Sequence, residues 1–167
     1  MCVEMIEKNK AKPVFSRLSK ADKEFLTNAR QLGERICDYY MDLKPKEIGP
    51  AELDRVYELW MADQKTRKPR DDELANGLGA LIGFLMVERH GFKWMNTIDV
   101  WGEGLTAIHL KTDWQIYPID FVWKRVKEKE PRAGFFKALH DHISTEIKRK
   151  GAHNKRLHRI ADKSGSR

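Results

Sequence analysis

The chain has 167 residues, a formal net charge of +7, and 41% hydrophobic and 34% charged side chains. A chain of this length is typical of one domain, and its five tryptophans and seven phenylalanines can anchor a hydrophobic core. This composition excludes a collagen, a disulfide-rich mini-protein and a fully disordered chain.

The start of the chain has the features of a loose, intracellular N-terminus. Residues 1–18 are expected to be flexible, because Pro13 interrupts any helix and no apolar secretory segment precedes it. The sequence has no run of 18 apolar residues, which excludes a membrane span. Cys2 and Cys37 are too few for a disulfide framework and lack the neighbours of a zinc site. We therefore expect a cytoplasmic protein with free thiols.

Two helices are predicted in the first part of the chain. Ser19 and Asp22 have the spacing of a helix-capping box, and a regular apolar stripe after them predicts a helix over 20–41. Gly49-Pro50 predicts the start of a second helix, because proline is favoured at the first helical position.

A third helix is predicted over 72–90, and it is the most apolar segment of the chain. Ala75, Gly79 and Gly83 recur every four residues and therefore share one face. Each glycine costs up to about 1 kcal/mol relative to alanine inside a helix, so we expect a close approach of another element to offset this cost. Gly91 is placed to end the helix.

After this helix the apolar spacing changes from helical to alternating. Three strands are predicted, over 92–100, 105–111 and 114–117. Their short turns indicate an antiparallel meander. In the first strand, the residues expected on one face are Phe92, Trp94, Asn96, Ile98 and Val100. Because strands and helices are segregated along the chain, the fold class is α+β: N-terminal helices, a three-stranded antiparallel meander, and C-terminal helices packed on the sheet.

A short helix after Pro118 and a last helix opened by Pro131 complete the prediction. The third and the last helices are the best candidates to cover the sheet. Apolar periodicity fades beyond Gly151, which divides the chain into a flexible N-terminus at 1–18, one domain at 19–150 and a basic flexible tail at 151–167.

The positive charge is concentrated at this end. Residues 148–167 contain eight basic residues against Asp162 alone, so they carry the whole net charge and residues 1–147 balance to zero. Such a tail can contact the phosphates of a nucleic acid, or it can be a solvated terminus. The residues that would serve nucleic-acid binding are Lys148, Arg149, Lys150, Lys155, Arg156 and Arg159.

The sequence contains no recognisable catalytic or metal-binding constellation. His140 and His142 are two residues apart on a predicted helix and point in different directions, so we expect no metal and no cofactor. A small acid–base hydrolase that uses Asp99, His109 and Asp113 is a second alternative function, and it requires one pocket that joins these side chains. An enzyme is the less favoured interpretation, since no nucleophilic Ser or Cys occurs between residues 38 and 143.

The turn after the first strand is the candidate partner-binding site. Trp101 stands beside a Gly-x-Gly turn between acidic neighbours, and tryptophan is enriched in binding hot spots. We expect Trp101 to anchor a partner protein, with Asp99 and Glu103 as the charged rim.

A series of short motifs resembles an uncharacterised bacterial family catalogued as a domain of unknown function. The motifs, which fall within about residues 72–130, are Leu78-Gly79, Gly83, Gly91-x-x-Trp94, Asp99-x-x-Gly102, Tyr117-Pro118 and Lys124-Arg125. Phe84 departs from the pattern, which has a polar or acidic residue after the glycine.

The resemblance implies a bacterial, intracellular α+β protein without established catalytic residues. By analogy with small proteins of this kind, our leading hypothesis is a non-enzymatic, immunity-type protein that neutralises a cognate toxin by direct binding. The alternative partner is nucleic acid, bound through the basic tail, and no membrane partner is expected.

Overall fold

The computed structural model describes residues 13–99, 102–112, 114–131 and 134–164, and side chains up to Lys150. The elements in chain order are β1 (Val14–Ser16), α1 (Lys20–Met41), a 3-10 turn (Pro45–Glu47), α2 (Pro50–Ala62), α3 (Asp71–His90), β2 (Lys93–Asp99), β3 (Gly102–His109), β4 (Trp114–Ile116), α4 (Pro118–Glu128) and α5 (Phe135–Ser164). The predicted α+β class is confirmed. All described strands form one antiparallel sheet in the order β1-β2-β3-β4.

The sheet has four strands where the sequence predicted three. The additional strand, β1, lies within the segment expected to be a flexible N-terminus and pairs with β2, with Val14 opposite Ile98. A three-residue strand is too short for a readable alternation, and Pro13 directly precedes it. It pairs with residues of β2 that lie at least 80 positions further along the chain, and local sequence patterns cannot predict such a pairing.

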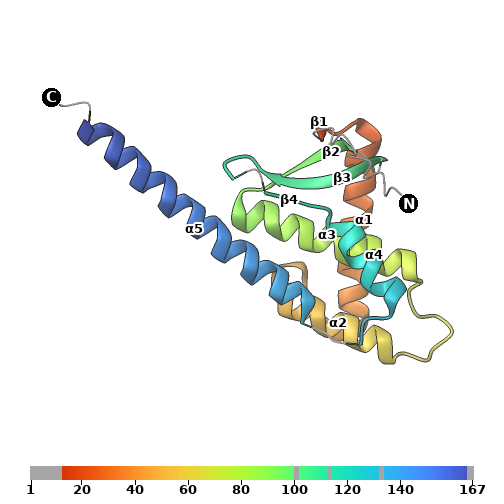
Figure 1. Cartoon of the computed structure of the whole chain (residues 1–167). Helices are drawn as coiled ribbons and strands as arrows, with labels where there is room; N and C mark the ends of the chain where they lie inside the picture. Colours follow the sequence, from red (N-terminus) through yellow and green to blue (C-terminus); the bar gives the residue numbers. More distant parts are fainter. Residues whose placement is uncertain (1–12, 100–101, 113, 132–133, 165–167) are drawn as a thin grey trace, which may run out of the picture.

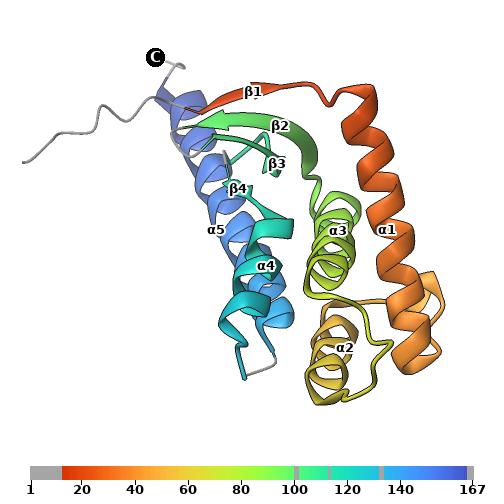
Figure 2. The same cartoon turned by 90° about the vertical axis from the view of Figure 1, so that its right-hand side faces the viewer.

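α3 is the central helix of the molecule. Figure 2 shows the sheet at one end, with α3 below it between α1 and α4, and α2 at the opposite end. α3 packs against α1 and α4 along its length and touches β2 and β3. Its predicted apolar residues are all buried: Leu74, Leu78, Leu81, Ile82, Leu85 and Met86.

The glycines of α3 sit where other elements come close, as predicted. A Cβ on Gly79 would lie 2.6 Å from Cα of Ile119 in α4, and one on Gly83 would lie 2.1 Å from the Trp94 ring in β2. A third glycine, Gly77, meets Gly33 of α1, whose added Cβ would fall 2.4 Å from the Gly77 carbonyl oxygen. The backbone of α3 therefore lies directly against the backbones of α1 and α4, and against the Trp94 ring of the sheet.

Local signals at the helix ends are confirmed. Ser19 and Asp22 form the capping box of α1, each accepting a hydrogen bond from the other's backbone amide. Gly91 ends α3 with φ of 71°, in the left-handed region that glycine tolerates best. Pro50 and Pro118 begin α2 and α4 at the first helical position.

The alternation of β2 holds in its first half and breaks in its second. Phe92 and Trp94 are buried as expected, but Ile98 is 53% exposed, while Thr97, expected on the other face, is buried. Val100 lies outside the described residues. The face that carries Trp94 packs on Gly83 of α3, and Ile98 lies four residues further along the strand, where the helical layer no longer covers it.

The last helix packs on a further element and is longer than predicted. α5 packs mainly on α2 and reaches the sheet through contacts of His142 and Lys150 with Trp114 of β4, while α3 and α4 also contact the sheet. Its backbone continues past Gly151 to Ser164, and Figure 1 shows its C-terminal part projecting beyond the sheet. Helix formers and basic residues dominate this stretch, and basic residues suit the C-terminal end of a helix dipole.

None of the described helices combines the length and the apolar character that crossing a bilayer requires.

Candidate functional site

The predicted partner-binding turn joins β2 to β3. Asp99 is the last residue of β2 and pairs with Gly102, and Glu103 pairs with Ile98. Trp101, the expected anchor, lies outside the described residues, so its role stays a prediction. The two acidic residues of the predicted site are therefore placed at the same end of the sheet.

A hollow of about 270 Å³ opens at this end. It is lined by Asp99, Gly102, Glu103, Gly104, Tyr117 and Asp120. The Tyr117 hydroxyl donates a hydrogen bond to Asp99 Oδ2 at 2.7 Å, and the Gln115 amide donates to Tyr117 Oη at 3.2 Å. The predicted site does not include Tyr117 and Asp120, which reach the hollow from the residue between β4 and α4 and from the first turn of α4.

The hollow is acidic and has one neutral donor. Burial, and then the hydrogen bond to Asp99, raise the pKa of Tyr117 to about 12, so its phenol keeps its proton and donates at neutral pH. Burial also raises the pKa of Asp120 above its ordinary value. Glu103 is held by Asn96, whose amide donates to Glu103 Oε1 at 2.5 Å.

An exposed apolar pair adjoins the acidic hollow. Val14 of β1 lies opposite Ile98 of β2, and Ile98 lies opposite Glu103 of β3, so the three side chains form one row across three strands. Val14 is 62% and Ile98 53% exposed. We call Val14, Ile98, Asp99 and Glu103 the sheet-end surface.

The three residues of the hydrolase alternative are not brought together. Asp99 pairs with the first residue of β3, whereas His109 is the last residue of that strand, about 20 Å away at the rise of an extended chain. His109 is buried, its Nδ1 lies 2.8 Å from Thr112 Oγ1, and burial lowers its pKa. Asp113 lies outside the described residues. The two described members therefore cannot share a pocket.

Two of the basic residues proposed for nucleic acid are engaged within the chain. The Lys150 amine donates to the carbonyl of Thr112 at 3.2 Å and stands over the Trp114 ring, and Arg149 pairs with Glu146. Lys148 is exposed. The side chains of Lys155, Arg156 and Arg159 lie outside the described part. The structure thus leaves nucleic-acid binding as a prediction.

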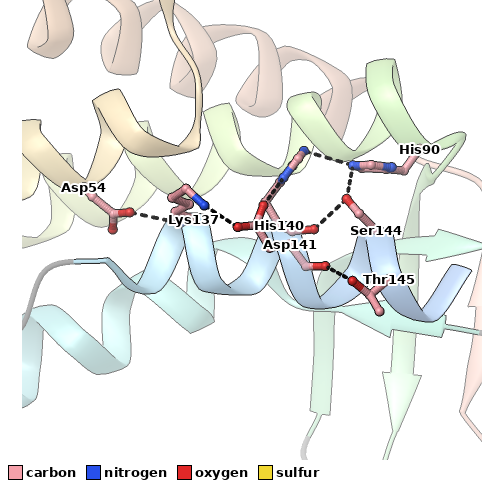
Figure 3. A network of polar contacts seen from close by, with 7 residues as sticks. All are labelled: Asp54, His90, Lys137, His140, Asp141, Ser144 and Thr145. Carbon is pink, nitrogen blue, oxygen red and sulfur yellow. Dashed lines mark hydrogen bonds and ion pairs between the residues drawn. The ribbon is translucent and has the colours of Figure 1, made fainter. Parts of the chain in front are cut away.

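A second polar cluster joins α5 to α2 and α3 (Figure 3). His90, the last residue of α3, faces His140 of α5 with their Nε2 atoms 3.0 Å apart, and Ser144 Oγ lies 3.1 Å from His90 Nε2. One turn before His140, the buried Asp54 of α2 accepts hydrogen bonds from the backbone amides of Phe136 and Lys137.

No sequence pattern predicts this histidine pair. The spacing predicts that His140 and His142 point in different directions, and His142 meets the Trp114 ring edge to face. The partner of His140 is His90, which is 50 residues away in the chain. Among the described residues, no group of three or more His, Cys, Asp or Glu side chains is placed to hold a metal ion.

Part of the chain matches the model of a protein family whose function is unknown. A family model described as "Domain of unknown function (DUF3806)" matches residues 57–134, which include the segment whose motifs suggested such a family. The specific motif pattern stays a prediction. No curated protein matches the chain.

One solved structure is similar in fold. It is the crystal structure, at 1.50 Å resolution, of a protein from Bacteroides thetaiotaomicron VPI-5482, with a TM-score of 0.58 and 15% sequence identity. The similarity covers 81% of this chain and 50% of that one, so this chain spans about half the length of its structural neighbour. At this identity the likeness concerns the fold alone.

Proposed function

We propose that this chain binds another protein through the sheet-end surface. The observation that carries the proposal is the row Val14–Ile98–Glu103, in which two exposed apolar side chains lie beside an acidic hollow. Protein interfaces commonly join an apolar centre to a polar rim that is accessible to solvent. The sheet end has both parts, and its polar part is built from carboxylates.

The chemistry of the hollow favours a partner with basic side chains. Asp99, Glu103 and Asp120 line it, and the phenol of Tyr117 holds Asp99 in place. A lysine or arginine side chain of the partner would complement these carboxylates, and opposite charges would also accelerate association. The favoured partner is therefore a protein with a basic segment beside an apolar one.

The more specific role that we propose is that of an immunity-type protein whose partner is a toxin in the cytoplasm. An acidic surface of this kind would cover a basic catalytic cleft and so block access to it. Trp101 lies between Asp99 and Glu103 in the sequence, and its replacement by alanine is expected to weaken such a complex by about 2 kcal/mol if it is a hot spot.

The test is capture of the partner from the native bacterium under nuclease treatment, followed by calorimetry with the purified pair. The test variant is Ile98→Ser combined with Glu103→Lys, which we expect to weaken binding at least tenfold, or about 1.4 kcal/mol. The matched control is Leu110→Ser, because Leu110 is as exposed as Val14 but follows the other end of β3. Equal loss in test and control, or none in either, overturns the proposed surface.

The nucleic-acid alternative is tested in the same preparation. A chain truncated after Gly151 loses five of the eight basic residues of the C-terminal segment. If nucleic acid is the partner, it follows the intact chain alone, and its affinity falls steeply as salt is raised. A nuclease-resistant partner retained by both forms supports protein binding.

A further inference from the structure

The contact between α3 and α5 brings together three atoms that can donate an electron pair. His90 Nε2 and His140 Nε2 face one another at 3.0 Å, and Ser144 Oγ is 3.1 Å from His90 Nε2. In Figure 3 both rings and the hydroxyl point toward a common region between the helices.

The proton positions follow from the neighbouring groups. Asp141 Oδ1 lies 3.2 Å from His140 Nδ1, and an ionised carboxylate can only accept, so His140 Nδ1 carries the proton. The Nε2 lone pair of His140 is then directed at His90. The Ser144 hydroxyl donates to the carbonyl of His140, which leaves its oxygen able to accept from His90 Nε2–H.

The contact of Asp141 with the outer nitrogen of His140 is also found at metal-binding histidines. A carboxylate behind a ligand histidine fixes its tautomer and raises its basicity. Two imidazoles bound to one tetrahedral zinc at about 2.0–2.1 Å hold their nitrogens roughly 3.3 Å apart. The pair would need to open by a few tenths of an ångström to admit the ion.

We propose that His90 and His140 bind one divalent transition cation of the zinc class, with water on the remaining positions. The cation takes the place of the proton on His90 Nε2, and that proton moves to Nδ1 of the same ring. The site would join the end of α3 to the second turn of α5. It is independent of the sheet-end surface, which lies on other elements.

The surroundings give the site access and set its charge. A hollow of about 280 Å³ is lined by His140, Asp141, Arg89 and Lys137 among others, so the His140 side of the site faces solvent. Asp141 supplies the opposing negative charge. Because His90 and His140 are the two protein ligands, binding of the cation depends on both of them.

The experiment is calorimetric titration of the full chain with ZnCl₂ in a buffer that does not chelate zinc. We expect one ion per chain, and an affinity at least about tenfold lower in His140→Asn. The matched control is His142→Asn on the same helix, which should bind as the unaltered chain does. A free Zn²⁺ concentration of about one hundred times the dissociation constant should raise the Tm of the chain by about 5–10 °C.

A second pair of variants decides the matter if His140→Asn does not fold. Asp141 is exposed, so Asp141→Asn should fold, and it should weaken zinc binding by about tenfold or more. Lys137→Gln removes the ion pair with Asp141 but leaves the contact of Asp141 with His140, and should not weaken binding. Equal affinity in the unaltered chain, His140→Asn and Asp141→Asn would overturn the proposal and indicate adventitious binding elsewhere.

Cu²⁺ as a probe gives an independent spectroscopic result. The electron paramagnetic resonance spectrum should show coupling to two imidazole nitrogens in the unaltered chain and to one in His90→Gln. Coupling that is the same in both proteins would also overturn the assignment.

Discussion

α3 meets its neighbours in two physically different ways. Along its middle, Gly77, Gly79 and Gly83 let α1, α4 and the Trp94 ring approach its backbone with no side chain between them. At its C-terminal end, His90 meets α5 through imidazole and hydroxyl groups. The first kind of contact depends on the volume of the side chains, and the second depends on the protonation state of its polar groups.

The difference separates the part of the fold that must be rigid from the part that can respond to its surroundings. Closely packed interiors have few voids, so a single added methyl group forces strain. A polar contact at the edge of the core can exchange a proton or a water molecule without repacking. Substitutions that add volume should therefore act strongly on the middle of α3, and changes of pH should act on its end.

The largest expected effect is that of Gly83→Ala. The added Cβ would lie 2.1 Å from Trp94 Cζ2, so either the ring or the helix must move, and we expect a loss of about 3 kcal/mol in the free energy of unfolding. Gly104→Ala is the control, because its Cβ would meet nothing within 4 Å. Urea denaturation measures both, and a loss in Gly83→Ala no larger than in the control would show that the contact is not tight.

A smaller loss is expected where α5 is tied to α2. Asp54 is buried and accepts two backbone hydrogen bonds of 2.9 Å from the first turn of α5. Asp54→Ala leaves both amides without this acceptor and should cost about 2 kcal/mol. Glu58→Ala on the same helix removes an exposed ion pair with Arg55 and should cost less than about 0.5 kcal/mol. Denaturation curves that rank the two variants in the reverse order would contradict this role of Asp54.

The smallest effect is a pH dependence at the end of α3. Burial first, then the charge of His140, lower the pKa of His90, so protonation is less favourable in the folded chain than in the unfolded one. The stabilising effect is complete above the unfolded value of about 6.5 and is lost as the pH falls through the lower folded pKa. His109, whose pKa is lowered by burial, acts with the same sign.

We therefore expect the free energy of unfolding to decrease as the pH falls from about 6.5 to 5, and to decrease less in His90→Gln. His142→Gln serves as the reference, since His142 lies on the exposed side of α5. Parallel pH profiles for the unaltered chain and His90→Gln, measured by chemical denaturation, would exclude this contribution.

The candidate site shows where sequence-based prediction reaches its limit. The acidic residues Asp99 and Glu103 are recognisable because they flank a predicted turn between two strands. Tyr117 and Asp120 join them from elements that follow later in the chain, and the sheet register alone aligns Val14 with Ile98. Alternation in β2 predicted Ile98 to be buried, and its exposure reflects where the helical layer ends.

Local physics determined the helices of this protein from the sequence alone: the capping box at Ser19, the proline starts at Pro50 and Pro118, and the apolar stripes between them need no distant partner. The close packing around Gly79 and Gly83 was also predictable, because glycine inside a helix requires compensation. Three features were decided by the tertiary structure: the pairing of β1, the packing of α5 mainly on α2, and the meeting of His90 with His140. Each depends on contacts between residues far apart in the chain, which arise from the fit of whole elements rather than from the spacing of neighbours.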